Sequence, residues 1–243
     1  MNRLKDQVAL ITGGGSGLGH ELSLALAREG VHIIVNYHTS EEKARETVKE
    51  IEGMGGKALT YEADISKTHE IFGMVDKVLE IFGKIDILIN NAGIFFRTPL
   101  EELTEEKWSQ ILDTNLKSVL FISQAVSRGM LREKGGRIIN IADVGGIRPW
   151  PGYIAYSISK AGVIMATKCL ARALAPEIVV NCIAPGLINV PPEWSEEKRE
   201  EMRKRIPTKR FSSHQDVVNA VLFLLCDVSY VTGQILVLDG GGS

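Results

Sequence analysis

The stretch 12-TGGGSGLG-19 decides the fold, because it joins a short apolar run, 7-QVALIT-12, to a helical pattern, 18-LGHELSLALAREG-30. Its glycines allow a tight turn from strand to helix. Such a turn lets backbone N–H groups approach a pyrophosphate, and the helix N-terminus adds the positive end of its dipole. The stretch therefore predicts the first strand–helix unit of a nucleotide-binding sheet.

Six more apolar runs follow the first, and each is short and rich in β-branched residues. Helical patterns separate the runs, and both faces of each run are apolar, which is typical of parallel strands covered on two sides. Repeated strand–helix–strand units produce right-handed crossovers and a doubly wound sheet. The sequence thus predicts an α/β fold with further strands in 31-VHIIVNY-37, 57-KALTYEA-63, 85-IDILIN-90, 136-GRIINIA-142, 178-IVVNCIA-184 and 234-QILVLD-239.

Composition argues against several classes of protein. The chain has 243 residues, of which 44% are hydrophobic and 24% charged, so it can bury a core and is neither disordered nor fibrous in character. A net charge of −2 provides no basic field for nucleic acid or an anionic membrane. No apolar run approaches the ~18 residues of a membrane helix, and the polar N-terminus does not resemble a signal peptide. Three widely spaced cysteines favour buried thiols in a reducing cytoplasm, with no metal site.

Local patterns predict the domain organisation and one helix start. No linker rich in Pro, Ser or Gly divides the chain, so residues 1–243 are expected to form a single domain. Thr39 with Glu42 three residues later is a capping-box pattern, which predicts that a helix through 43–51 begins at this threonine.

The segment 193–210 differs from the rest of the chain, because it contains seven basic and five acidic residues. Pairs such as Glu200 with Lys204 and Glu201 with Arg205 stand four residues apart, which favours a solvated helix face. The alternative is a mobile lid over a site, spanning about 186–212.

The residues after the second and third runs indicate which nucleotide binds. An NAD site usually has Asp or Glu after the second strand, to bind the ribose hydroxyls. The stretch 36-NYHTS-40 has no acid there, and its Asn, His and Ser side chains can hydrogen-bond a 2′-phosphate. NADP is therefore favoured, although such polar loop residues also leave NAD possible. Asp64 is placed to hold an adenine amino group, and 90-NNAG-93 is small enough for close approach of the cofactor.

Tyr156 and Lys160 stand four residues apart and share one face of a helix. An ammonium near a phenol stabilises the phenolate and lowers the pKa of the tyrosine toward working pH. The tyrosine can then exchange a proton with a substrate while hydride moves, and the lysine can also reach the cofactor ribose.

Taken together, these motifs resemble the short-chain dehydrogenase/reductase family over nearly the whole chain. The resemblance implies a Rossmann fold with a seven-stranded parallel sheet, helices on both faces, and NAD(P)(H) across the carboxyl edge. It also implies a small-molecule substrate, dimers or tetramers, and a relay in which Asn115 holds a water next to Lys160. The matching motifs are 12-TGGGSGLG-19, Asp64, 90-NNAG-93, Asn115 in 114-TNLKS-118, Tyr156 with Lys160, 185-PG-186 and 232-TGQILVLDGG-241.

The resemblance assigns the site residues position by position. The catalytic residues are expected to be Tyr156, Lys160, Asp143 and Asn115. The substrate is expected to contact Phe95 and Asp143. The cofactor is expected to contact Gly13, Ser16, Gly17, Leu18, Gly19, Asn36, His38, Ser40, Asp64, Ile65, Asn91, Ala92, Gly93, Tyr156, Lys160, Pro185, Gly186 and Ile188.

Asp143 departs from the family, which has a serine thirteen residues before the tyrosine to polarise the substrate carbonyl. An ionised carboxylate cannot donate a hydrogen bond and repels a developing oxyanion. Asp143 therefore has a pKa raised by burial, or faces a substrate with N–H donors or positive charge. Asp with Tyr and Lys resembles the pteridine reductase subgroup, in which a phenylalanine at the place of Phe95 stacks on a pterin. The arginines of that subgroup at the place of Gly17 and near Thr39 are absent.

The leading hypothesis is an NADPH-dependent reductase that transfers hydride to a C=N bond of a pterin-like substrate. The alternative is a carbonyl reductase, for example of 3-oxoacyl thioesters, in which Asp143 works protonated. A third possibility is a nucleotide-binding sensor or scaffold without turnover, because a fold alone does not fix a function.

Overall fold

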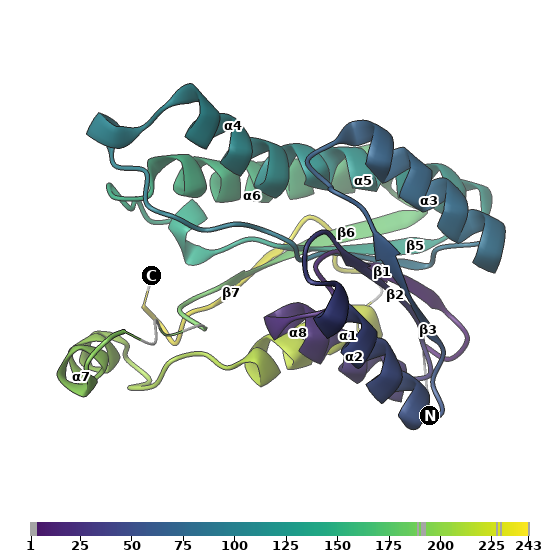
Figure 1. Cartoon of the computed structure of the whole chain (residues 1–243), viewed down its shortest axis with the longest axis horizontal. Coiled ribbons are helices and arrows are strands. Elements are labelled where there is room, and N and C mark those ends of the chain that lie inside the picture. The colour runs from purple at the N-terminus through teal and green to yellow at the C-terminus, as the bar shows by residue number, and fades with distance from the viewer. Residues whose placement is uncertain (1–3, 189, 191–192, 227, 229, 243) are drawn as a thin grey trace.

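Seven parallel strands form one sheet in the computed structural model, which describes residues 4–188, 190, 193–226, 228 and 230–242 (Figure 1). The strand order is β3-β2-β1-β4-β5-β6-β7, so the direction of winding reverses between β1 and β4. Ligands of such sheets bind outside the carboxyl ends of the strands at this reversal. Each predicted run contains one strand: β1 Val8–Ile11, β2 His32–Tyr37, β3 Ala58–Glu62, β4 Ile87–Asn90, β5 Gly136–Ile141, β6 Ile178–Pro185 and β7 Ile235–Leu238.

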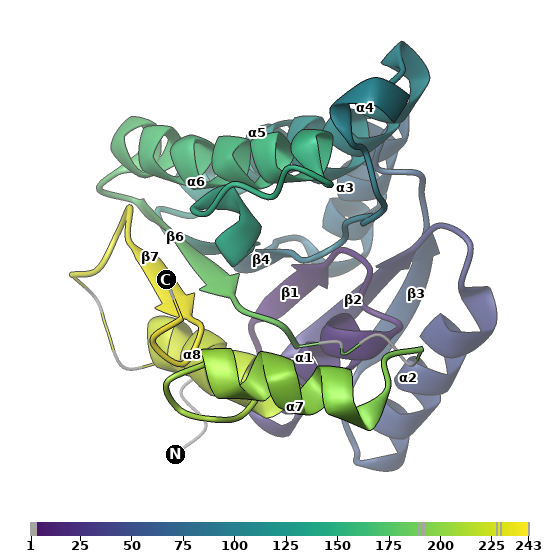
Figure 2. The same ribbon diagram turned by 90° about the vertical axis from the view of Figure 1, so that its left-hand side faces the viewer.

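Helices cover both faces of the sheet, which confirms the predicted doubly wound fold (Figures 1 and 2). One face carries α1 (Gly17–Arg28), α2 (Glu41–Gly53) and α8 (His214–Cys226). The other carries α3 (Thr68–Phe82), α4 (Glu105–Leu112), α5 (Ser118–Arg132) and α6 (Ile154–Leu174). A π-helical turn, Asp113–Lys117, connects α4 to α5, and α7 (Glu196–Arg205) lies apart from both layers.

Strand residues alternate between two hydrophobic cores, one on each face. In β1, Leu10 belongs to the core beneath α3 and α5, whereas Ile11 belongs to the core beneath α1 and α8, and both are fully buried. In β2, Ile34 and Ile33 divide in the same way. This alternation explains why the runs are apolar at every position. None of the described helices is long and apolar enough to cross a membrane.

Two local features qualify the sequence predictions. The capping-box prediction at Thr39 is wrong, because Ser40 occupies the N-cap and α2 begins at Glu41. In the charged segment, Glu201 pairs with Arg205 as its spacing suggests, but Glu200 pairs with Arg203. Helix α7 buries none of its residues, as expected for a solvated helix.

Candidate functional site

A cleft of about 740 Å³ opens at the carboxyl edge of the sheet, over the point where the winding reverses. Its walls come from loops that follow six strands, β1 to β6. All the expected cofactor and substrate residues line this cleft except Gly19, and all the expected catalytic residues line it except Asn115. The fold therefore brings together positions that lie up to 175 residues apart, from Gly13 to Ile188.

The glycine-rich turn is held against the loop after β4. The Thr12 hydroxyl accepts hydrogen bonds from the backbone N–H groups of Asn91 and Ala92, each at 3.0 Å. Gly13 has a φ of 61°, which favours glycine, and a Cβ on Gly19 would lie 2.0 Å from the Gly13 carbonyl oxygen. Gly19 therefore contributes close packing of helix and turn instead of lining the cleft.

A cofactor pyrophosphate fits the geometry of this turn. A Cβ on Gly17 would meet no atom within 4 Å, so the space in front of the turn is open to a ligand. Helix α1 begins at this residue, and its N-cap Ser16 makes no side-chain cap hydrogen bond. The first N–H groups of the helix are therefore available to phosphate oxygens.

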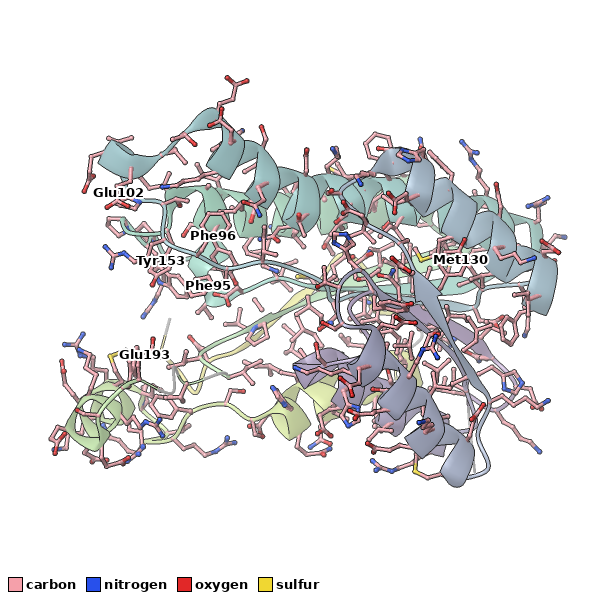
Figure 3. All side chains as sticks on the ribbon, viewed as in Figure 1. Phe95, Phe96, Glu102, Met130, Tyr153 and Glu193 are labelled. Atoms are coloured by element: carbon pink, nitrogen blue, oxygen red, sulfur yellow. The ribbon has the colours of Figure 1, made fainter. Side chains whose placement is uncertain are left out.

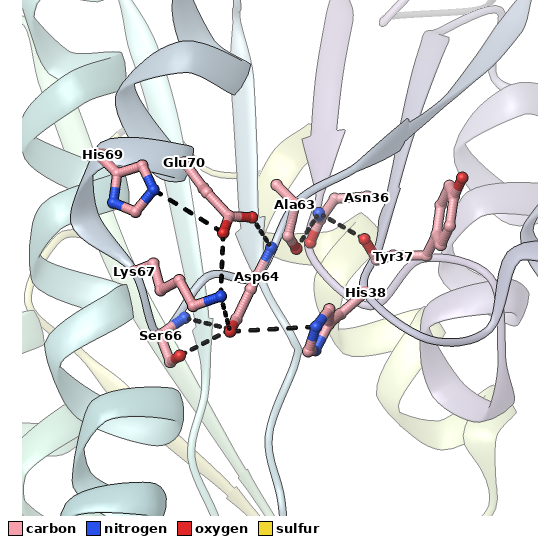
Figure 4. A network of polar contacts seen from close by, with 9 residues as sticks. All are labelled: Asn36, Tyr37, His38, Ala63, Asp64, Ser66, Lys67, His69 and Glu70. Carbon is pink, nitrogen blue, oxygen red and sulfur yellow. Dashed lines mark hydrogen bonds and ion pairs between the residues drawn. The ribbon is translucent and has the colours of Figure 1, made fainter.

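At the end of β2, a polar network surrounds Asp64 (Figure 4). The Asp64 carboxylate accepts hydrogen bonds from the Ser66 backbone N–H at 3.0 Å and the Ser66 hydroxyl at 2.7 Å. Its other oxygen lies 3.5 Å from Lys67 Nζ and 4.0 Å from His38 Nε2. Burial alone would raise the pKa of Asp64, but the Ser66 hydrogen bonds and the nearby cations outweigh it and lower the pKa. Asp64 is thus a fixed anion in the cleft.

Asn36 has little capacity left for a phosphate. Its Nδ2 group lies within hydrogen-bond distance of the carbonyl oxygens of Tyr37, Tyr61 and Ala63, at 3.2–3.4 Å. The side chain is also almost fully buried. Since a phosphate needs donors, and the amide donors of Asn36 are engaged, this residue supports the loop and leaves phosphate binding to its neighbours.

At the opposite end of the cleft, Tyr156 donates a hydrogen bond from its hydroxyl to Asp143 Oδ2 at 3.0 Å. The other oxygen, Asp143 Oδ1, accepts from the Gly145 backbone N–H at 2.6 Å. The loop that carries Asp143 approaches α6 closely, because a Cβ on Gly146 would lie 2.6 Å from the Lys160 carbonyl carbon. The two glycines thus place the carboxyl beside the tyrosine.

The expected effect of Lys160 on the tyrosine is wrong. Burial and the charge of Asp143 raise the pKa of the Tyr156 hydroxyl instead of lowering it. Lys160 Nζ donates to the Ile141 carbonyl oxygen at 3.0 Å and lies 5.8 Å from the centre of the Tyr156 ring. Burial raises the pKa of Asp143 and lowers that of Lys160. The tyrosine is accordingly a proton donor that stays protonated across the physiological range.

Asn115 lies in the π-helical turn behind this site, and its side chain fastens the loop after β4. Its Oδ1 accepts from the Ile94 backbone N–H at 2.8 Å, and its Nδ2 donates to the Ile94 carbonyl oxygen at 2.9 Å and to Ser159 Oγ at 3.2 Å. Wide helical turns of this kind are frequent at functional sites. Asn115 therefore joins the cleft wall to α6.

Aromatic rings form the outer wall beside Tyr156. Phe95 is 54% exposed and stacks on Tyr153, with ring centres 4.5 Å apart and planes within 7° (Figure 3). Trp150 lies parallel to the Tyr156 ring at 6.2 Å and meets Phe95 edge-on. Sequence reasoning identified Phe95 but missed Trp150 and Tyr153. Their only signal was an aromatic-rich stretch just before the catalytic tyrosine.

The charges along the cleft fall into two pairs. Among the described residues that line it, only His38 and Lys160 are basic and only Asp64 and Asp143 are acidic. One pair follows β2 and β3, and the other lies near the end of β5 and on α6. An elongated ligand along this cleft would meet the glycine-rich turn in its middle and a proton donor at one end.

Comparisons with known proteins agree with this geometry. A family model described as short chain dehydrogenase matches residues 7–202. A 3-oxoacyl-[acyl-carrier-protein] reductase of Staphylococcus epidermidis is 40% identical over 237 residues, covering 96% of this chain and 97% of the relative. The corresponding reductase of Thermotoga maritima is 41% identical over 243 residues, with 98% of each chain covered. The structure of a putative short-chain alcohol dehydrogenase from Sinorhizobium meliloti superposes with a TM-score of 0.93 at 32% identity, covering 99% of this chain and 98% of the other.

Proposed function

Since the chain belongs to the short-chain dehydrogenase/reductase family, we propose that it is an NADPH-dependent reductase of a carbonyl group in a 3-oxoacyl thioester. The chain is an oxidoreductase of this family, whose members use NAD(P)(H). The observation that carries the proposal is the Tyr156 hydroxyl, held protonated at one end of a cleft that suits a dinucleotide. The thioester substrate is supported by relatives about 40% identical over nearly the whole chain.

Each group in the cleft then has a distinct task. The bound coenzyme supplies hydride, and the N–H groups at the start of α1 bind its pyrophosphate. Tyr156 donates a proton to the carbonyl oxygen of the substrate as that oxygen gains negative charge. Lys160, buried behind the tyrosine, contributes positive charge and reaches toward the coenzyme ribose. Asn115 holds the loop that carries Gly93 and Ile94 in place.

Asp143 takes part in carbonyl reduction only in its protonated form. Burial raises the pKa of this carboxyl, so the protonated form persists to higher pH than for a solvated aspartate. A protonated carboxyl donates a hydrogen bond and can polarise the substrate carbonyl as a serine hydroxyl does. Once ionised, it repels the developing oxyanion and slows the reaction.

The second candidate is reduction of a C=N bond in a pterin-like heterocycle, and Asp143 is the observation that favours it. An ionised carboxylate beside Tyr156 suits a substrate that presents N–H donors or positive charge. The exposed Phe95 ring could stack on such a flat substrate. The relatives named above favour the thioester, and the pteridine reductase arginine is replaced by Gly17.

NADPH oxidation by the purified protein tests the two candidates together. One set of assays contains 3-oxoacyl thioesters and simple ketones, and the other contains dihydropterin and oxidised pterin, all at saturating NADPH. Turnover of thioesters that disappears in Tyr156→Phe supports the first candidate. Turnover of pterins alone replaces it with the second. If NADPH binds but no substrate in either set is reduced, both assignments are wrong.

A further inference from the structure

The cleft offers very few groups that can recognise a phosphate on the adenosine ribose. Of the two basic residues among the described lining positions, Lys160 is buried behind Tyr156, in the half of the cleft built by β5 and α6. His38 follows β2, next to the carboxylate expected to hold the adenine amino group. Its side chain is 57% exposed, so it is accessible to a ligand.

The neighbours of His38 cannot supply the missing positive charge. The amide donors of Asn36 are engaged by backbone carbonyls. Gly17, across the turn, has no side chain, although the space in front of it is open. Ser40 caps α2 without a side-chain hydrogen bond, so its hydroxyl can donate one neutral hydrogen bond. Only His38 can form an ionic contact with a 2′-phosphate in this part of the cleft.

We propose that His38 is the residue that selects NADP(H) over NAD(H), and that this selection weakens as rising pH removes its charge. The inference rests on the proposed use of NADPH and adds how the coenzyme is distinguished. Histidine is the side chain whose charge changes near neutral pH, unlike the arginine or lysine that would provide a permanent charge. Selection by this chain is therefore expected to depend on pH.

The charged groups around His38 allow it to carry a proton when a phosphate arrives. Asp64 Oδ2 lies 4.0 Å from His38 Nε2 and also 3.5 Å from Lys67 Nζ, so Lys67 partly offsets the charge of Asp64. Glu70 pairs in turn with Lys67 at 3.3 Å (Figure 4). On the other side, the ionisable groups that influence the adjacent Tyr37 are Glu41, Arg45 and Glu62. The surroundings thus include acids that favour the imidazolium, and a phosphate adds two further negative charges.

Coenzyme binding, measured without any substrate, tests the proposal. Dissociation constants for NADPH and NADH come from nucleotide fluorescence, and those for 2′,5′-ADP and 5′-AMP from calorimetry, between about pH 6.5 and pH 8.5. In this range the 2′-phosphate remains largely dianionic. The variants are His38→Asn, which cannot be charged, and His38→Arg, which is always charged. His69→Asn is the matched control, because His69 belongs to the same polar network but does not line the cleft.

The wild-type protein should lose preference for NADPH and 2′,5′-ADP as pH rises, while NADH and 5′-AMP binding stays level. His38→Asn should lower the NADPH preference about tenfold at the acidic end, the scale of one charge-assisted contact. His38→Arg should retain a strong preference at every pH, and His69→Asn should behave as wild type.

An unchanged preference in His38→Asn would overturn the proposal, as would equal losses for NADPH and NADH, which would mean that the ring contacts adenine. Strong NADH binding without any NADPH preference in the wild type would refute the role of His38 while leaving reductase activity possible. Failure to bind either coenzyme would instead refute the proposed function.

Discussion

Replacing Asp143 with serine should accelerate carbonyl reduction at high pH. A carbonyl oxygen that accepts from Tyr156 lies about 4 Å from Asp143, given the 3.0 Å between Tyr156 Oη and Asp143 Oδ2. Two full charges at that separation repel by about 4 kcal/mol at an effective dielectric constant of ~20. If half a charge develops on the oxygen in the transition state, the ionised carboxylate costs about 2 kcal/mol, or roughly 30-fold in rate.

The sign with pH follows from the raised pKa of Asp143. Below that pKa the carboxyl is protonated and donates to the substrate, so wild type and Asp143→Ser should have similar kcat/KM for a 3-oxoacyl thioester. Above it, the wild-type kcat/KM should fall while that of the serine variant stays level, until they differ about 30-fold. Asp143→Asn, which has a donor and no charge, should follow the serine variant.

The assay is the initial rate of NADPH oxidation between about pH 5 and pH 9.5, with coenzyme saturation checked at each pH. A flat wild-type profile, with no gain in either variant, would show that Asp143 does not face the developing charge. A loss of activity on pterins in Asp143→Ser would instead assign the carboxylate a direct role with a nitrogen heterocycle. Equal or better pterin turnover in that variant would remove this role.

The other predictions concern the proton donor and the glycines. Tyr156→Phe should lower kcat by about 10²- to 10⁴-fold with little change in the dissociation constant for NADPH, which stopped-flow and fluorescence titration can measure; an active variant would exclude Tyr156 as the donor. Gly19→Ala should reduce both thermal stability and NADPH affinity, because its Cβ would collide with the Gly13 carbonyl oxygen. Gly73→Ala, in an exposed turn of α3 where a Cβ meets nothing, should instead raise the free energy of unfolding by about 0.5–1 kcal/mol in urea titrations; equal effects would contradict the steric argument.

The fold could be predicted from the sequence because the apolar runs record burial on both faces of the sheet. Leu10 and Ile11 belong to opposite cores, and a strand buried on two sides leaves a continuous apolar run. The start of α2 was predicted less well, because Thr39 and Ser40 are both good N-cap residues and only the chain path decides between them. Boundaries depend on such local competition more than the existence of an element does.

The site was predictable where the resemblance fixed the positions, and less so where contacts decide the chemistry. The sequence places Lys160 one helical turn from Tyr156, but it does not reveal that the ammonium donates to Ile141 and the tyrosine to Asp143. Likewise, the burial and backbone contacts of Asn36 remove a phosphate ligand that its residue type suggests. Trp150 was missed because nothing in an irregular loop indicates which ring turns toward the cleft.

The π-helical turn at Asp113–Lys117 makes the spacing between α4 and α5 sensitive to chain length. Such a turn contains one more residue than an α-helical turn, so it resembles an insertion that the helix has absorbed. Deleting Thr114 would let the chain close into a continuous α-helix, and everything on one side of the deletion would rotate by about 100° relative to the other. Asn115 could then no longer face Ile94 and Ser159 while α5 kept its contacts with α3. The loop after β4 thus depends on a residue count that no single substitution would reveal.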